Sequence, residues 1–229
     1  VMLAADYSQI ELRVIASLSN DTNMISAFKN NEDIHSSTAS KVFNIDIDNV
    51  SREQRSNAKT VNFGIIYGVS AFGLSNQTNL SRSESKDLIE SYFLAYPELK
   101  NYIANQINFA RENGFVETIL GRKRYLRDIN SRNQIVRGGA ERNAVNAPVQ
   151  GSAADIIKLA MVNISNKISS WNLKSKMLVQ VHDELIFEIY KPELQEMKKL
   201  IQEEMESAYS LNVPLAVDIG FGNNWYEAH

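Results

Sequence analysis

Two acidic residues stand at the ends of apolar segments in this chain of 229 residues. Asp6 closes the apolar run 1–5, and Asp183 lies within a second apolar segment, 178–187. Both segments have the composition of β-strands, which sets each carboxylate at a strand end. Neighbouring carboxylates resist joint ionisation unless a cation lies between them, so strands that meet here would make a site for a hard divalent metal. The chemistry that this predicts is Mg²⁺ chemistry on phosphate.

Each of the two acids also has a simpler interpretation. An Asp after a strand is commonly a turn residue or a helix cap, which would explain Asp6 by itself. The segment 182–184 is typical of a hairpin tip, yet such tips usually carry Gly or Asn. Two acids and a His depart from turn chemistry, and departures of this kind tend to be functional. Asp183 is therefore the stronger indication of a site.

A third set of residues shares one face of a predicted helix. Two cations lead and two aromatic residues follow, at a spacing of four: Arg55, Lys59, Phe63 and Tyr67. Each step of four advances only about 40° around a helix, so the four side chains lie in one stripe. An ordinary amphipathic helix has the same spacing, but a core stripe would not begin with two cations. Such a face could hold a triphosphate with its cations and a sugar and base with its rings.

Together these segments resemble the C-terminal palm and fingers portion of the family A DNA polymerases, the bacterial DNA polymerase I type. Residues 6–13 are similar to motif A of that family, residues 55–68 to motif B on its O helix, and residues 181–184 to motif C. Further agreement lies in segments 33–35, 142–151 and 224–229. The resemblance covers essentially the whole chain, and three ordered motifs are far more specific than one short pattern.

The resemblance implies transfer of a deoxynucleotide to a primer 3′-hydroxyl, with two Mg²⁺ ions as cofactors and release of pyrophosphate. Asp6, Asp183 and the backbone carbonyl of Tyr7 would bind the ions. Glu184 would be an auxiliary catalytic acid beside them. His182 would position the primer end or brace the hairpin, since Mg²⁺ prefers oxygen ligands.

For the incoming nucleotide, the resemblance implies that Arg55 and Lys59 hold the triphosphate, with Lys59 also donating a proton to pyrophosphate. Phe63 would pack on the sugar, and Tyr67 would stack near the templating position. The remaining nucleotide contacts that it implies are His35, Gln9 and Glu11.

Glu11 has two interpretations, and both stay open on the sequence. By resemblance it is the steric gate that blocks a ribose 2′-hydroxyl and so selects deoxynucleotides. Ser8 and Glu11 also have the spacing of a capping box, which would explain both residues as the start of a helix.

Primer–template DNA is the macromolecular partner that the resemblance implies. Arg142, Asn146 and Gln150 repeat the spacing of four on another helical stretch, and they would contact the minor-groove acceptors common to all base pairs. A solvated polar face has the same pattern, so only the resemblance assigns them to DNA.

The formal net charge of −3 argues against DNA binding, but the charge is unevenly distributed. Residues 111–142 hold eight Arg or Lys against four acids, which makes this stretch a candidate surface for the phosphate backbone. At its centre are Arg122, Lys123 and Arg124. A solvated charged face is the alternative.

Composition agrees with these assignments. A hydrophobic content of 44% allows a real core, and the absence of cysteine excludes disulfides and thiolate metal sites and suits a cytoplasmic protein. No apolar stretch approaches the roughly 18 residues of a membrane span. Because the chain begins with Val1, five residues before Asp6, we expect the thumb and the upstream palm elsewhere in a longer polypeptide.

The expected fold class is α+β, with an antiparallel palm sheet packed by helices and a mainly helical fingers subdomain. Strands are expected at 1–6, 176–190 as a hairpin and 215–221, with a small hairpin over 115–129. Helices are expected at 8–18, 33–43, 51–68, 82–112, 152–170 and 192–209, and Pro97 punctuates the stretch 82–112. The resemblance divides the chain into palm (1–30), fingers (31–142, with the O helix at about 51–68) and palm (143–229).

Two other functions remain open. One is a non-catalytic fragment that binds DNA or nucleotide. The other is a phage-type single-subunit RNA polymerase, although Glu11 and Glu184 favour a DNA polymerase because the RNA enzymes usually differ at both positions. Without a thumb to hold the primer–template, the 229 residues are expected to be weakly active alone.

Overall fold

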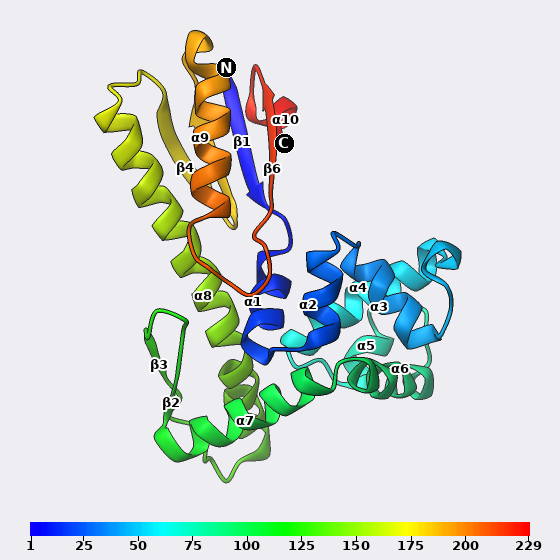
Figure 1. Cartoon of the computed structure of the whole chain (residues 1–229). Helices are drawn as coiled ribbons and strands as arrows, with labels where there is room; N and C mark the ends of the chain where they lie inside the picture. Colours follow the sequence, from blue (N-terminus) through cyan, green and yellow to red (C-terminus); the bar gives the residue numbers. More distant parts are fainter. The chain divides into compact units, whose positions relative to one another are not determined.

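The chain folds into two compact units, whose course Figure 1 colours from blue to red. The structure, a computed structural model, describes residues 1–229. Residues 1–11 and 152–229 form the first unit, and residues 12–151 form the second. The expected boundaries between palm and fingers, after residues 30 and 142, both fall inside the second unit. The division of the chain by role stays a prediction.

A four-stranded antiparallel sheet forms the centre of the first unit. Its strands are β1 (Met2–Tyr7), β4 (Lys176–Val181), β5 (Glu184–Glu188) and β6 (Val217–Gly222), in the order β4-β5-β1-β6. The apolar run in β1 is buried on both faces, as expected of an interior strand: Leu3 and Ala5 are 0% exposed and Ala4 is 3% exposed. The sheet confirms the predicted α+β class and its antiparallel palm-type sheet.

One face of this sheet is covered by α9 (Leu194–Glu206). Side chains alternate along a strand, so Tyr7 and Asp6 lie on opposite faces. The Tyr7 hydroxyl donates to the Met205 carbonyl oxygen at 2.6 Å, which places α9 on the Tyr7 face. Figure 1 shows this helix, in orange, running alongside the strands.

The short helix α10 (Trp225–Ala228) covers the opposite face. Ala4 and Ile186 pack there against Ala228. A Cβ added at Gly220 would collide with the Ala228 carbonyl oxygen, so the glycine is what allows α10 to lie this close to β6. The Asp6 face therefore carries a helix that was not among the predicted elements.

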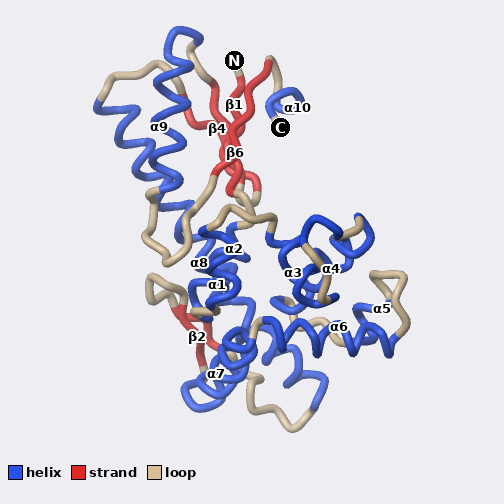
Figure 2. The backbone as a smooth tube through the Cα atoms, turned by 45° about the vertical axis from the view of Figure 1, so that its right-hand side comes forward, coloured by secondary structure: helices blue, strands red, loops and turns tan.

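Helices make up most of the second unit. They are α1 (Ile10–Ser19), which begins in the first unit, then α2 (Thr22–Lys29), α3 (Ile34–Phe43), η1 (Ile47–Asn49), α4 (Arg52–Ile66), α5 (Ala71–Ser75), α6 (Arg82–Ala95), α7 (Pro97–Asn113) and the first part of α8 (Gln134–Ser170). Its strands, β2 (Phe115–Glu117) and β3 (Lys123–Tyr125), pair as the small hairpin that the sequence predicts. Figure 2 shows how little of this unit is strand. In the first unit, η2 (Lys191–Glu193) precedes α9.

Side-chain caps and one proline set several helix boundaries. Ser51 caps α4 and Ser81 caps α6, each in a reciprocal capping box with the residue three positions on. Pro97 occupies the first turn of α7, where its missing N–H costs no hydrogen bond. The helical stretch predicted over 82–112, with its punctuation at Pro97, forms two helices, α6 and α7.

Helix α1 begins two residues later than the helix expected over 8–18. Gln9 has a left-handed φ of 54°, so α1 begins only at Ile10 and Ser8 is not the residue that directly precedes it. The capping box and the steric gate both stay predictions for Glu11. Glu11 lies in the first turn of α1, where its negative charge suits the helix dipole.

The helix predicted at 152–170 is the second part of α8, a single element of 37 residues. It continues through Pro148, which lacks the N–H for one hydrogen bond of the helix. Ala144, Ala147 and Val149 are buried around this point, and their packing offsets the missing hydrogen bond. Even this helix lacks the combination of length and apolar character that crossing a membrane requires, and no other helix has it.

Candidate functional site

The first unit brings the two predicted carboxylates together. Asp183 lies at the tip of the β4–β5 hairpin, and β5 pairs with β1 so that Glu184 stands opposite Asp6. The Tyr7 backbone N–H donates to the Asp183 carbonyl oxygen at 3.2 Å, which ties the hairpin tip to the end of β1. Burial, followed by the charge of Asp183, raises the pKa of Asp6 to about 6. A cation between the two carboxylates would relieve this repulsion.

The backbone is strained beside both carboxylates. Gln9 has a φ of 54° and His182 a φ of 55°, whereas every other non-glycine residue with positive φ is an Asn. Each such residue costs on the order of 1 kcal/mol, and strain of this kind concentrates at functional sites. The Gln180 side-chain amide donates to the His182 carbonyl oxygen at 2.9 Å and so braces the turn. Within the first unit, both motif segments thus depart from ordinary turn geometry.

Glu184 is buried, and α10 provides partners for both of its carboxylate oxygens. Trp225 Nε1 donates to Oε2 at 3.1 Å, and His229 Nδ1 lies 3.0 Å from Oε1. The hydrogen bond to Glu184 and then its charge raise the pKa of the exposed His229 imidazole. These contacts fix the orientation of Glu184. The sequence indicated segment 224–229 only by resemblance, and no local pattern pointed to its contact with Glu184.

A third acid on the same face, Asp218, was not among the predicted site residues. Asp218 in β6 stands opposite Asp6 in β1, on the side away from β5. Asp6, Glu184, Asp218 and His229 line one hollow of about 320 Å³. Only the strand register, which the sequence does not specify, places Asp218 there.

The donor set suits a metal ion that arrives with its substrate. No group of three or more His, Cys, Asp or Glu side chains is placed to hold a metal ion. The predicted ligands are the carboxylates of Asp6 and Asp183 and the carbonyl of Tyr7, all oxygen donors. Mg²⁺ is typically held by one or two carboxylates together with water and substrate phosphates. The residues present therefore fit Mg²⁺ and do not form a complete cage.

In the second unit, Arg55 at the start of the stripe is paired with Asp33. Its Nε and Nη2 donate to the two carboxylate oxygens at 2.7 and 3.0 Å. Asp33 also caps α3 by accepting the Ser36 backbone N–H at 2.9 Å. Burial alone would raise the pKa of Asp33, but the hydrogen bonds from Arg55 and Ser36 hold it well below its ordinary value. The fork fixes the guanidinium beside the N-terminus of α3.

The other three residues of the stripe line a common groove on α4. Lys59, Phe63 and Tyr67 lie along an open groove of about 410 Å³. Tyr67 is 39% exposed, and Phe63 is half-buried with its ring 5.8 Å from that of His35. The predicted order of cation and then aromatic residues along one helix face is therefore present. His35, predicted as a further phosphate contact, stands beside it.

The basic hairpin and part of the predicted DNA-binding helix come together in the second unit. Arg122 donates to the Gly151 carbonyl oxygen at 3.0 Å. Arg122, Lys123, Arg124 and Gln150 share a groove of about 170 Å³. Gln150 thus shares one surface with the basic residues of the hairpin, which the sequence assigned to DNA separately.

The other two residues of that helical set lie closer to α4. Arg142 is exposed, and a Cβ added at Gly68 would meet its side-chain carbons, so the arginine stem packs on the turn after α4. The side-chain oxygen of Asn146 is buried without a hydrogen-bond partner. A buried unpaired amide oxygen is costly, and a functional site is one of the recognised reasons for it.

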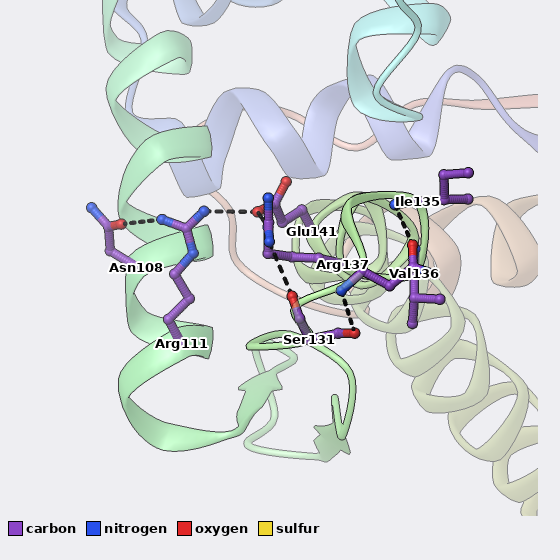
Figure 3. A network of polar contacts seen from close by, with 8 residues as sticks. Asn108, Arg111, Ser131, Ile135, Val136, Arg137 and Glu141 are labelled. Carbon is purple, nitrogen blue, oxygen red and sulfur yellow. Dashed lines mark hydrogen bonds and ion pairs between the residues drawn. The ribbon is translucent and has the colours of Figure 1, made fainter.

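Two cations of the basic stretch have a structural partner instead. Figure 3 shows Arg111 and Arg137 converging on Glu141, at 2.7 and 3.6 Å. Arg111 also donates to Asn108, and Arg137 to the Ser131 carbonyl oxygen. These contacts join α7 to the start of α8. The basic surface is therefore smaller than the count of charges over 111–142 indicates.

Comparison with known proteins gives consistent matches over the whole chain. The model of the family described as DNA polymerase family A matches residues 1–227. DNA polymerase I of Caldicellulosiruptor bescii is 53% identical over 227 residues, covering 99% of this chain and 27% of the relative. DNA polymerase I of Streptococcus pneumoniae strain R6 is 52% identical over 229 residues, covering 100% of this chain and 26% of the relative. The chain thus spans about a quarter of the length of these curated relatives.

A solved structure has the same fold. The POL domain of Pol1 from M. smegmatis, in complex with DNA primer-template and dNTP, matches with a TM-score of 0.95 at 46% sequence identity. The match covers 99% of this chain and 40% of that one. With the three motifs placed on the elements that the sequence predicted and a family match that leaves only two residues uncovered, the chain belongs to DNA polymerase family A.

Proposed function

We propose that this chain carries out template-directed DNA synthesis, the transfer of a deoxynucleotide to a primer 3′-hydroxyl. The observation that supports this most directly is the paired Asp6 and Asp183 at the meeting point of β1 and the β4–β5 hairpin, in a member of family A. A two-metal-ion mechanism is part of the proposal, and the likeness to bacterial DNA polymerase I supports DNA synthesis without bearing on the number of metal ions.

Asp6 and Asp183, with the Tyr7 carbonyl, would hold two Mg²⁺ ions. When bound, the ions would activate the primer hydroxyl and stabilise the leaving pyrophosphate. Metal binding requires ionised carboxylates, and the burial that raises the pKa of Asp6 favours its neutral form when no ion is bound. Glu184, held by Trp225 and His229, would act as a fixed auxiliary acid.

The nucleotide would lie along the stripe on α4. Lys59 would bind the triphosphate and donate a proton to the leaving pyrophosphate, while Phe63 packs on the sugar and Tyr67 stacks near the templating position. Arg55 would bind the triphosphate with the N–H groups that do not contact Asp33. A guanidinium carries five N–H donors, and the two hydrogen bonds to Asp33 use two of them. The exposed cations and the groove on α4 support this assignment.

We assign sugar selection to Glu11, with Gln9 as a further nucleotide contact. Glu11→Ala should raise ribonucleotide incorporation, because a shorter side chain leaves room for a 2′-hydroxyl. The measurement is the ratio of deoxynucleotide to ribonucleotide incorporation efficiency. An unchanged ratio would remove Glu11 from this role.

The proposed macromolecular partner is primer–template DNA, which the solved relative binds together with dNTP. Arg122, Lys123 and Arg124 would contact the phosphate backbone. Gln150, in the same groove, would contact the minor groove together with Arg142 and Asn146 on the same helix. His182, at the strained hairpin tip, would position the primer end.

Because the relatives are about four times as long, we also propose that a thumb and further palm strands of the same polypeptide complete the enzyme. The 229 residues alone would then be weakly active, since a displacement of about 1 Å at the reacting atoms can cost roughly 10²-fold in rate. Processive synthesis by these residues alone would refute this part. A cytoplasmic location is likewise a proposal.

The test is single-nucleotide extension of a labelled primer–template with Mg²⁺, by the whole protein and by its Asp183→Asn variant. We expect matched, deoxy-selective extension that falls by more than about 10²-fold in the variant, because even groups that only support a metal ligand cost about 10–100-fold. Asp218→Asn is the matched control, an acid on the same sheet face that has no role in the proposal. The extension rate of the Asp218→Asn variant should stay within a few-fold of that of the unsubstituted protein.

Two alternatives predict different outcomes in this assay. A non-catalytic fragment would bind primer–template and nucleotide but show no Mg²⁺-dependent extension. A phage-type RNA polymerase would prefer ribonucleotides, and the DNA polymerase relatives at 52–53% identity weigh against it. Equal loss in the Asp183 and Asp218 variants would point to a general structural defect.

A further inference from the structure

A chain of four buried polar side chains runs through the second unit and ends at His35. The Tyr96 hydroxyl lies 2.9 Å from Thr38 Oγ1, Thr38 Oγ1 donates to Asn62 Oδ1 at 3.1 Å, and Asn62 Nδ2 lies 3.0 Å from His35 Nδ1. Tyr96, Thr38 and Asn62 are 0% exposed and His35 is 3% exposed. No solvent is therefore at hand to satisfy Tyr96, Thr38 or Asn62 by another route.

The chemistry of each group sets the direction of the chain. Thr38 has one hydroxyl hydrogen, and it is used on Asn62, so Tyr96 is the donor to Thr38. Because Asn62 Oδ1 accepts from Thr38, its NH₂ group faces His35, and an amide nitrogen only donates. His35 Nδ1 must then be the acceptor. Every donor points toward the imidazole.

The acceptor role of Nδ1 leaves the imidazole proton on Nε2. An imidazolium would turn an N–H of its own against the Asn62 N–H and lose this hydrogen bond. The charged groups around the ring are Asp33 at the cap of α3 and Arg55 and Lys59 on α4. Burial lowers the pKa of His35 to about 4, with Asp33 opposing and the two cations adding to the effect.

We propose that Asn62, held by Thr38 and Tyr96, fixes His35 as a neutral Nε2–H donor for the incoming triphosphate. The three partners are positioning residues, and this step rests on the proposed nucleotide binding. Arg55 and Lys59 already supply positive charge on this side of α4. A neutral third donor adds a directed hydrogen bond with no further charge to desolvate when the site is empty.

The first test needs no nucleotide, and a variant serves only to assign the signals. Histidine labelled with ¹⁵N is incorporated into the protein, and the ring-nitrogen shifts of His35 are identified with a His35→Asn variant among the three histidines of this chain. We expect Nδ1 to have the shift of an unprotonated nitrogen and Nε2 that of a protonated one, unchanged across the neutral pH range. A protonated Nδ1, whether in the other tautomer or in an imidazolium, overturns the proposal.

A pair of tyrosines provides a matched comparison for the positioning role. Tyr96→Phe removes the hydroxyl that begins the chain, whereas Tyr92→Phe removes a buried hydroxyl without a hydrogen-bond partner from the adjacent ring. We expect Tyr96→Phe to populate the second tautomer and raise the KM for deoxynucleotide by up to about fivefold, with kcat less affected. Tyr92→Phe should change neither. Equal effects of both substitutions would assign Tyr96 to packing alone and refute its role.

Asn62→Asp reverses the polarity at the ring, because a carboxylate accepts where the amide donates. The expected result is a proton on Nδ1 and a weaker response of the Nε2 shift to added nucleotide. In the unsubstituted protein, added deoxynucleotide should move the Nε2 shift, and binding without such a shift refutes the contact. If the tautomer is as expected and no nucleotide binds by calorimetry, the proposed function fails and the fixed tautomer stands.

Discussion

Burial moves two titratable side chains of the proposed site toward their neutral forms, one in each unit. It raises the pKa of Asp6 to about 6 and lowers that of His35 to about 4. The causes differ after burial: Asp183 adds repulsion at the first, and the cations of α4 add repulsion at the second. An acid whose pKa is raised by a neighbouring acid gains from a cation bound between them. A histidine whose pKa is lowered stays neutral and keeps one nitrogen as a hydrogen-bond donor and the other as an acceptor.

Repulsion between Asp6 and Asp183 should lower the free energy of unfolding, so the proposed site reduces the stability of the protein. Without divalent ions at neutral pH, Asp183→Asn should raise the free energy of unfolding by roughly 1 kcal/mol, the scale of one pKa unit. The measurement is urea unfolding in the presence of a chelator. Asp218→Asn should have a smaller effect, because its charge is the last of the causes that raise the pKa of Asp6. A destabilised Asp183→Asn protein would contradict the repulsion.

The lowered pKa of His35 predicts loss of stability in acid. The unfolded chain protonates this histidine near its ordinary pKa of 6.5, while the folded protein does so only near 4, so its contribution is complete above 6.5 and is lost as the pH falls toward 4. Between about pH 7 and about pH 5 the loss should be about 2 kcal/mol. Urea unfolding at both pH values measures it.

The control for this pH dependence is His35→Asn, which removes the titrating group. Its stability should fall less between the two pH values, and the difference between the two proteins isolates His35 from the carboxylates that also titrate. An identical pH dependence in both proteins would show that His35 is not the source.

At the scale of elements, the short helix α10 depends on one glycine in β6. Gly220→Ala should destabilise the protein by about 1–3 kcal/mol, because the added Cβ meets the Ala228 carbonyl oxygen and pushes α10 off the sheet. Gly139→Ala is the matched control within α8, where the nearest side-chain atom is 3.9 Å away, and it should stabilise by about 1 kcal/mol. Urea unfolding compares the two. Equal changes would mean that α10 is not held by this close approach.

The displacement of α10 in Gly220→Ala should also move Trp225 and His229, which hold the Glu184 carboxylate. The elements that carry strong local signals were predictable, since the apolar run in β1 and the serine caps of α4 and α6 are properties of short segments. The start of α1 and the continuity of α8 through Pro148 were not, because tertiary packing overrides local preference at Gln9 and Pro148.

At the scale of the whole molecule, the charge distribution matters more than the net charge of −3. Arg111 and Arg137 are paired with Glu141, whereas Arg124 lines the groove with Gln150. The prediction for DNA binding follows from this difference. Arg124→Ala should reduce the slope of log K against log salt by about 0.9, as expected for one lost phosphate contact.

Arg111→Ala is the control for charge alone, because it removes the same charge from a residue that is paired with an acid, whereas Arg124 donates only to the neutral Asn143 side chain. It should leave the salt slope unchanged. Fluorescence anisotropy of a labelled primer–template over a salt series gives both slopes. If the two variants change the slope equally, the groove on β3 and α8 is not the contact surface.

The sequence by itself determined the class of fold, the three motif segments and the order of charge and aromatic residues along α4, because these depend on residue types at short spacing. Only the tertiary structure decided which side chains meet. Asp218 reaches Asp6 through strand register, Trp225 and His229 reach Glu184 through the folding back of α10, and Asn62 reaches His35 through the packing of α4 on α3. Contacts between distant segments depend on how whole elements pack, and no local pattern in the chain encodes that packing.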